Sequence, residues 1–134
     1  MSGVIGVSTA ETGRYSVFYA SLEGVQLPPE PIQKIYARSA VISENRNNIT
    51  KHALDSGADW VLYLDDDHVL SRDVLTRLLA ADKDVVSAHY TQRQPPFAPV
   101  AMSHELPNGG FIKLALDPTQ KGLLSVAASG AGCM

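Results

Sequence analysis

The feature that most constrains this chain is a run of five apolar residues, Trp60 to Leu64, that ends directly in three aspartates, Asp65-Asp66-Asp67. An uninterrupted apolar run of this length is typical of a parallel strand covered by helices on both faces. We therefore expect an α/β fold with this strand at the centre of a parallel sheet. The carboxyl ends of such strands open onto the crevice where α/β proteins bind ligands. The triplet thus marks a candidate site.

Patterns on both sides of this run predict alternating helices and strands. Ser71 is expected to cap a helix with apolar residues at helical spacing, and Val85 to Ala88 is expected to be the next strand. Residues 60–88 would then form one βαβ unit. The other expected elements are a strand at 4–7, a short helix at 17–22, a weak strand at 35–37, a helix from Ser39 or Ser43 to Ser56 that stops at Gly57, a half-buried strand at 111–116 and a last strand at 123–128.

Length and composition limit the number of domains and the kinds of partner. With 134 residues, 45% of them hydrophobic, the chain suits one α/β domain over residues 1–134. The formal charge is -3 and no run of Lys or Arg occurs, which argues against nucleic acid. Cys133 is the only cysteine, so an internal disulfide is excluded and a cytoplasmic location is expected. The N-terminus resembles neither a signal peptide nor a membrane span, so no membrane segment is expected.

The acidic triplet has the chemistry of a metal site. Adjacent carboxylates repel one another, and their pKa values rise unless a cation neutralises them. Mg²⁺ and Mn²⁺ prefer oxygen ligands, commonly one or two carboxylates completed by substrate phosphates. In an extended turn Asp65 and Asp67 point the same way and can share one ion. His68 is a secondary candidate ligand, with a place in the following turn as its alternative.

Two other interpretations of the triplet stay open. The three residues can form a solvated turn, since Asp is a common turn residue. Alternatively, Asp65-Asp66-Asp67-His68-Val69 fits the D-x-D-x-[TV] pattern of haloacid-dehalogenase-type phosphatases, in which Asp65 would be the nucleophile and Asp67 the acid-base. That pattern normally lies on the first strand, with a Lys and further acids well downstream. Here two expected strands precede the triplet.

An ordered set of motifs resembles the GT-A glycosyltransferases, most closely family 2 enzymes of bacteria and phages. In that family an Arg-Asn helix precedes a strand of the form gadyllflDdDh, and a dkdvVs segment follows. The resemblance covers about Val4 to Met134, and the ordered set is more specific than the D-x-D element alone. The matching segments here are Ser43 to Thr50, Ala53-Leu54, Gly57 to Trp60, Leu64 to His68, Leu78-Leu79 and Asp82 to Ser87.

The resemblance implies a GT-A, Rossmann-like, mostly parallel sheet and a UDP- or GDP-sugar donor held with Mn²⁺ or Mg²⁺. Asp65 would lie near the ribose and diphosphate, Asp67 would hold the metal, and Asp66 would assist. The other implied donor contacts, each with a surface or turn position as its alternative, are Ser8, Thr9 and Glu11 in the nucleoside loop, Arg46 facing the nucleotide, Arg93 in the Pro-rich loop, and Gly130 and Gly132 beside the sugar.

In the family, the catalytic carboxylate of inverting members follows the small-residue segment that Gly130-Ala131-Gly132 resembles. Here the sequence stops at Met134, so we expect the base beyond that residue and the chain to be the N-terminal, donor-binding part of a longer enzyme. A relative that keeps the fold without catalysis is the other possibility.

Overall fold

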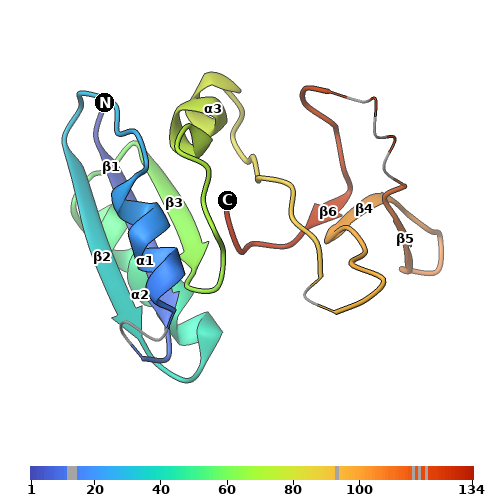
Figure 1. Ribbon diagram of the computed structural model, residues 1–134, viewed down its shortest axis with the longest axis horizontal. Coiled ribbons are helices and arrows are strands. Elements are labelled where there is room, and N and C mark those ends of the chain that lie inside the picture. The colour runs from blue at the N-terminus through green and yellow to red at the C-terminus, as the bar shows by residue number, and fades with distance from the viewer. Residues whose placement is uncertain (12–14, 93, 116, 118, 120) are drawn as a thin grey trace. The chain divides into compact units, whose positions relative to one another are not determined.

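Alternating strands and helices build a parallel sheet in the first half of the chain. The computed structural model describes residues 1–11, 15–92, 94–115, 117, 119 and 121–134. The sheet has the order β2-β1-β3, and both pairings are parallel (Figure 1). Its elements are β1 (Gly3–Thr9), α1 (Ser16–Glu23), β2 (Ile32–Arg38), α2 (Ile42–Asp55), β3 (Trp60–Asp65) and α3 (Val74–Ala80). The expected α/β class is therefore confirmed, with a Rossmann-like strand order.

The described chain divides into two compact units. The first, which we call the parallel unit, consists of residues 1–86 and 131–134. The second, the antiparallel unit, consists of residues 87–130. The expectation of one domain over residues 1–134 stays a prediction.

The central strand of the parallel sheet is β1, and the prediction that residues 60–64 would be central is wrong. All seven residues of β1 are buried, whereas β3 alternates between buried and half-buried positions. The second edge of β3 is met by the end of the chain: Leu64 forms an antiparallel bridge with Cys133, and the Tyr63 N–H donates to the Met134 carbonyl at 2.8 Å. The apolar run is therefore covered on that edge by an antiparallel segment.

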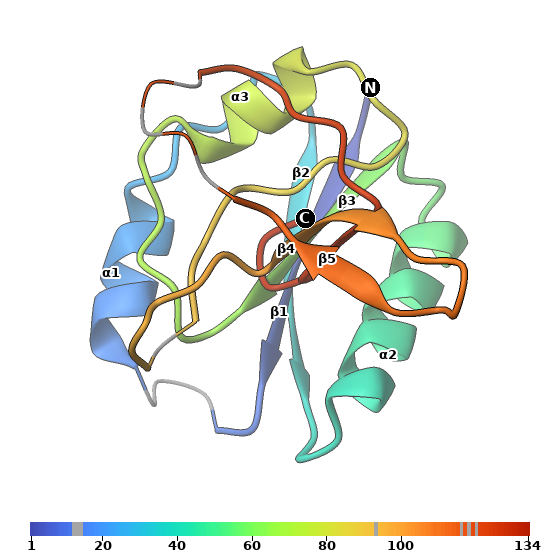
Figure 2. The same ribbon diagram turned by 90° about the vertical axis from the view of Figure 1, so that its right-hand side faces the viewer.

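Helices cover both faces of this sheet, as expected. Figure 2 shows α1 and α2 on opposite sides of the strands. A side chain at Gly6 would overlap Ile49 of α2, so the even-numbered residues of β1 face α2. The odd-numbered residues Ile5 and Val7 face the other side, where α1 buries Phe18 and Leu22. The core of the unit lies on these two faces of β1.

The helix ends differ from the expected caps. The first residue before α2 is Val41, without a side-chain cap, so neither Ser39 nor Ser43 is the N-cap. The Ser39 hydroxyl instead accepts the Val41 N–H at 3.1 Å and donates to Glu44 at 2.7 Å, and in this way fixes the entry to the helix. The predicted stop is confirmed, because Gly57 adopts a positive φ of 65°, a conformation that glycine allows without strain.

Two predictions around α3 are wrong. The helix begins at Val74 after Asp73, so Ser71 is not its N-cap, although the Ser71 carbonyl accepts the Val74 N–H at 3.2 Å. Residues 85–88 form no strand, so residues 60–88 are not a βαβ unit. The physical reason is that residues 132–134 already occupy the edge of β3 that a further parallel strand would need, and Val85 is 72% exposed. The parallel crossovers run through α1 and α2 instead.

The antiparallel unit holds a small sheet of order β5-β4-β6. Its strands are β4 (Ala101–Glu105), which the sequence did not predict, β5 (Phe111–Lys113) and β6 (Ala128–Ser129). All three residues of β5 are exposed, so the predicted half-buried strand is shorter and more exposed than expected. The predicted strand at 123–128 is wrong except at Ala128. Among the described hydrophobic residues of this unit only Ala101 is buried, which explains why periodicity misled here.

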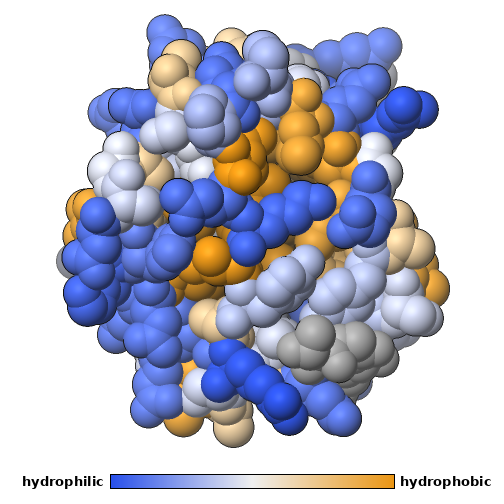
Figure 3. Space-filling model, turned by 90° about the vertical axis from the view of Figure 1, so that its left-hand side faces the viewer, coloured by the Kyte–Doolittle hydropathy of each residue, from blue (hydrophilic) through white to orange (hydrophobic). Residues whose placement is uncertain are grey.

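The surface is mixed in character. On the face shown in Figure 3, apolar side chains are interrupted by hydrophilic ones. In the part of the chain that the structure describes, no helix has the length and apolar character needed to cross a membrane.

The close contact between Gly6 and Ile49 yields a test of this packing. Gly6→Ala should lower the free energy of unfolding by about 1–3 kcal/mol, because the new methyl group overpacks the interface of α2 and β1. Ile49→Ala opens space for it, so the double variant should be more stable than the sum of the single effects predicts. Gly24→Ala is the matched control, since its Cβ would meet only carbonyl oxygens at 3.4 and 3.9 Å. Urea denaturation of the parent and the four variants measures these differences, and strictly additive effects of Gly6→Ala and Ile49→Ala would contradict the contact.

Candidate functional site

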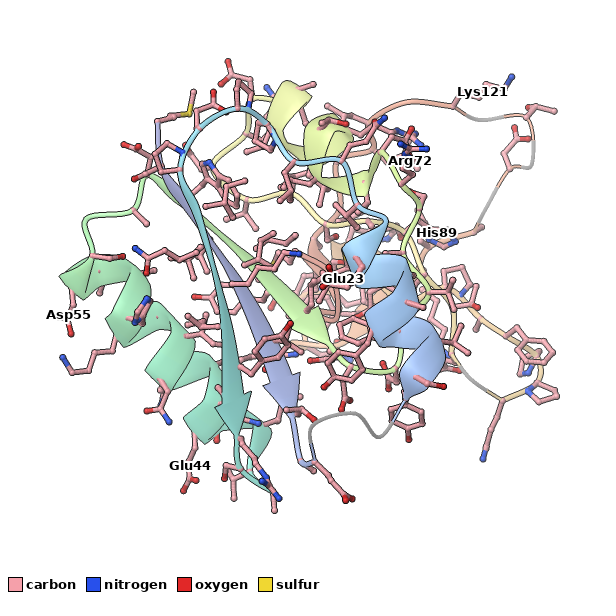
Figure 4. All side chains as sticks on the ribbon, turned by 60° about the vertical axis from the view of Figure 1, so that its left-hand side comes forward. Glu23, Glu44, Asp55, Arg72, His89 and Lys121 are labelled. Carbon is pink, nitrogen blue, oxygen red and sulfur yellow. The ribbon has the colours of Figure 1, made fainter. Side chains whose placement is uncertain are left out.

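Among the described residues singled out in the sequence, Ser8, Thr9, Arg46 and the triplet lie where strands β1 and β3 end and α2 begins. Ser8 of β1 lies in register with Asp65 of β3, so the end of the first strand adjoins the triplet. Figure 4 labels Glu44 in the first turn of α2 and Asp55 in its last turn. The Glu44 end of the helix is the one that carries Asn45 and Arg46. The site is thus built from the carboxyl ends of β1 and β3 and from the first turn of α2.

Asp65 is held by Arg46. One guanidinium nitrogen, Nη2, lies 3.2 and 3.3 Å from the two carboxylate oxygens of Asp65 and also donates to the Ala131 carbonyl at 3.2 Å. Both side chains are partly shielded, with 31% of Arg46 and 25% of Asp65 exposed. Arg46, predicted to face the nucleotide, therefore has a partner within the triplet itself.

Asp66 is held by a different partner on the first strand. The Thr9 hydroxyl donates to Asp66 Oδ2 at 2.6 Å and accepts the backbone N–H of Glu11 at 3.1 Å. Thr9 is almost fully buried, while Glu11 is exposed. Thr9 thus joins the loop after β1 to the middle of the triplet, which makes it a positioning residue as well as a predicted ligand contact.

These two contacts separate the negative charges of the triplet. Asp65 shares its face of the sheet with Ser8 and with α2, because partners in a parallel register point the same way. Asp66 follows on the opposite side and meets Thr9, whose side chain alternates with that of Ser8. The first two carboxylates are therefore directed apart. The triplet was expected to need a cation that neutralises its charge. The Arg46 guanidinium supplies one positive charge beside Asp65.

Asp67 and His68 form the remaining part of the triplet region. The imidazole Nε2 of His68 lies 3.5 Å from Asp67 Oδ1. Burial lowers the pKa of His68 below its ordinary value, and the negative charge of Asp65 partly opposes this shift. The neutral imidazole that burial favours is the form that binds metals.

The fit of a metal ion depends on how many ligands these residues supply. Within the described residues, no group of three or more His, Cys, Asp and Glu side chains could hold an ion by itself. Mg²⁺ and Mn²⁺ do not need such a cage when substrate phosphates complete the shell. Oxygen donors from one or two carboxylates at a strand end therefore fit an ion bound together with a phosphate ligand.

Asn45 is a site residue that the sequence analysis missed. It is 2% exposed, and its amide nitrogen donates to the carbonyls of Thr9 at 3.3 Å and Ser39 at 3.0 Å. Its Oδ1 and the hydroxyl of buried Ser8 have no hydrogen-bond partner among the described residues. The sequence could have predicted this burial, because Asn45 precedes the apolar Ile49 by four residues and therefore lies on the same face of the helix.

The remaining predicted residues lie in different environments. Gly132 is buried, and its carbonyl accepts the Asp65 N–H at 2.9 Å. Gly130 belongs to the antiparallel unit, where a side chain would overlap the Tyr90 hydroxyl and Val100. Its small size is thus explained by packing. Arg93 lies outside the described residues.

Comparison with protein-family models, with curated proteins and with solved structures finds no match to this chain. The structure shows an α/β chain with a parallel β2-β1-β3 sheet and a separate antiparallel sheet, and no family is identified.

The ion pair of Arg46 and Asp65 can be measured directly. A double-mutant cycle with Arg46→Ala and Asp65→Ala should give a coupling of about 0.5–1 kcal/mol in the free energy of unfolding, because both side chains are partly exposed. The coupling should weaken in 1 M NaCl. The control cycle uses Arg77 and Asp73, which lie 3.9 Å apart with 75% and 52% of their side chains exposed and should show no measurable coupling. Equal coupling in both cycles would contradict the contact.

Proposed function

We propose that this chain carries the donor site of a metal-dependent glycosyltransferase of the GT-A type, which binds a nucleoside-diphosphate sugar at the end of β3. The observation that carries the proposal is that three separate motifs lie together at the carboxyl ends of β1 and β3. Arg46 contacts Asp65, and Thr9 contacts Asp66. The nucleoside loop, the Arg-Asn helix and the acidic triplet of the resemblance are thus neighbours in space.

The position of the site supports binding of a phosphate ligand. Open α/β sheets bind ligands outside the carboxyl ends of their strands, and the triplet follows β3 at that edge. A bound divalent ion would act as a Lewis acid that stabilises the charge developing on the diphosphate leaving group. Asp67, with Asp65 as its neighbour, would hold that ion, and His68, whose Nε2 lies 3.5 Å from Asp67 Oδ1, would offer a nitrogen ligand.

The protein residues have distinct proposed roles. The loop after β1, through Glu11 and the backbone around Ser8, would hold the nucleoside. Thr9 and Asp66 would position that loop relative to the triplet through their hydrogen bond. These residues would bind the donor, and none of them is proposed as the base that activates an acceptor.

A phosphatase of the haloacid-dehalogenase type is the rival enzyme, and the pairing of Asp65 argues against it. Its nucleophile must attack phosphorus with an available carboxylate oxygen. Here one Arg46 nitrogen is within 3.3 Å of both Asp65 oxygens, which draws electron density from the group. The pattern also lies on the third strand of the chain, at an edge of the order β2-β1-β3. A fold without catalytic function is the other rival.

Calorimetric titration with UDP, GDP and CDP, each with and without Mn²⁺, tests the proposal. We expect one nucleotide to bind in a metal-dependent manner. Asp67→Ala should weaken that binding at least about tenfold, because it removes a carboxylate ligand, a change of about 1.4 kcal/mol or more in binding free energy. Asp84→Ala is the control, since Asp84 is an exposed carboxylate of the same unit and should leave the affinity unchanged.

Three outcomes separate the functions. Metal-dependent binding lost only in Asp67→Ala supports the donor site. Release of phosphate from a small phosphoester, with a covalent phosphate on Asp65, would replace the proposal by the phosphatase. If no nucleotide binds in the presence of Mn²⁺ while circular dichroism shows a folded chain, the donor-site proposal is wrong for this chain.

A further inference from the structure

The Arg46 guanidinium has a second consequence for the metal, which depends on how its charge is placed. Its Nη2 is fixed by both oxygens of Asp65 and by the Ala131 carbonyl, all within the parallel unit. A nitrogen with three acceptors at 3.2 to 3.3 Å is directed into the protein rather than toward solvent. The positive charge therefore already lies beside one of the carboxylates that a metal ion would use.

The other members of the triplet leave few ligands for a metal that arrives alone. Asp66 accepts the Thr9 hydroxyl and lies on the face opposite to Asp65. Asp67 lies close to His68, and no cluster of three acidic, His or Cys ligands exists among the described residues. A hexacoordinate ion would thus obtain most of its ligands from water or from a bound phosphate group.

We propose that Arg46 is the resident counterion of Asp65, which keeps the affinity of the site for a free divalent ion low and makes metal binding depend on a nucleoside diphosphate. This inference rests on the donor site proposed above. The diphosphate supplies the oxygen ligands that the triplet lacks. Because the chelate of one divalent ion and a diphosphate keeps a net negative charge, Arg46 favours the chelate while it disfavours the free ion.

The proposal predicts effects of opposite sign for one substitution. Arg46→Gln removes the positive charge, so the affinity for Mn²⁺ alone should rise about fivefold or more, since an unpaired carboxylate attracts a cation more strongly. The affinity for the chelate of Mn²⁺ with UDP or GDP should fall by about the same factor. A purely structural role of Arg46 would weaken both, because a distorted site binds every ligand less well. Opposite signs therefore identify the counterion role.

The experiment follows free Mn²⁺ by electron paramagnetic resonance during titration of the full chain. The variants are Arg46→Gln and Arg46→Lys, which keeps the charge and should bind Mn²⁺ as the parent does. Arg77→Gln is the matched control: it removes one positive charge from a side chain that is 75% exposed, and it should change neither affinity. Unchanged or weaker binding of Mn²⁺ alone by a folded Arg46→Gln variant would overturn the proposal.

A measurement on the parent chain keeps the proposal testable if Arg46→Gln does not fold. The affinity for Mn²⁺ should be at least about tenfold higher in the presence of saturating UDP or GDP, and by linkage the nucleotide should gain the same factor from Mn²⁺. Equal Mn²⁺ affinity with and without a nucleotide that does bind the chain would overturn the inference. If no nucleotide binds at all, the donor-site proposal fails. A rise in affinity for Mn²⁺ alone in Arg46→Gln would then still establish the counterion role by itself.

Discussion

The close packing of α2 against β1 at Gly6 is the contact on which the candidate site depends. Because Gly6 has no side chain, Ile49 fills the space above the strand and the helix lies close to the sheet. One turn earlier on the same helix, Asn45 reaches the carbonyl of Thr9, and its neighbour Arg46 reaches Asp65. A helix held further from the sheet would lose both contacts. A glycine in the middle of a strand thus sets the electrostatics at the end of the neighbouring strand.

Most elements of the parallel unit could be predicted because their signals are local. The β-branched run of β1, the apolar run of β3 and the stop of α2 at Gly57 each depend on neighbouring residues only. The order of the strands, in contrast, depends on contacts between residues that are far apart in the sequence. A continuous apolar run suggested that β3 was central, but β3 is the outer strand of the order β2-β1-β3, and only a short antiparallel segment with Cys133 and Met134 pairs with its other edge. The same segment explains why residues 85–88 remain outside the sheet.

The position of the acidic triplet at a strand end was predicted, but the contacts of its side chains were not. The triplet was expected at the carboxyl end of a strand, and it is there. The contact of Arg46 with Asp65 depends on how α2 lies over β3, which no spacing in the sequence reveals. The contact of Thr9 with Asp66 depends on the register of β1 and β3. Asn45 was missed because a polar residue near a helix start is usually solvated, whereas here two carbonyls satisfy its amide nitrogen.

The way the triplet is stabilised bears on what a metal would do here. Structural metal sites fold only when the ion neutralises their ligands, so that binding and folding are one event. In this chain Asp65 has a guanidinium and Asp66 has a hydroxyl, and the two side chains are directed to opposite faces of the sheet. The repulsion among the carboxylates is thus reduced by the protein itself. At the donor site proposed above, the binding free energy of a divalent ion would then be available to select a ligand that carries phosphate.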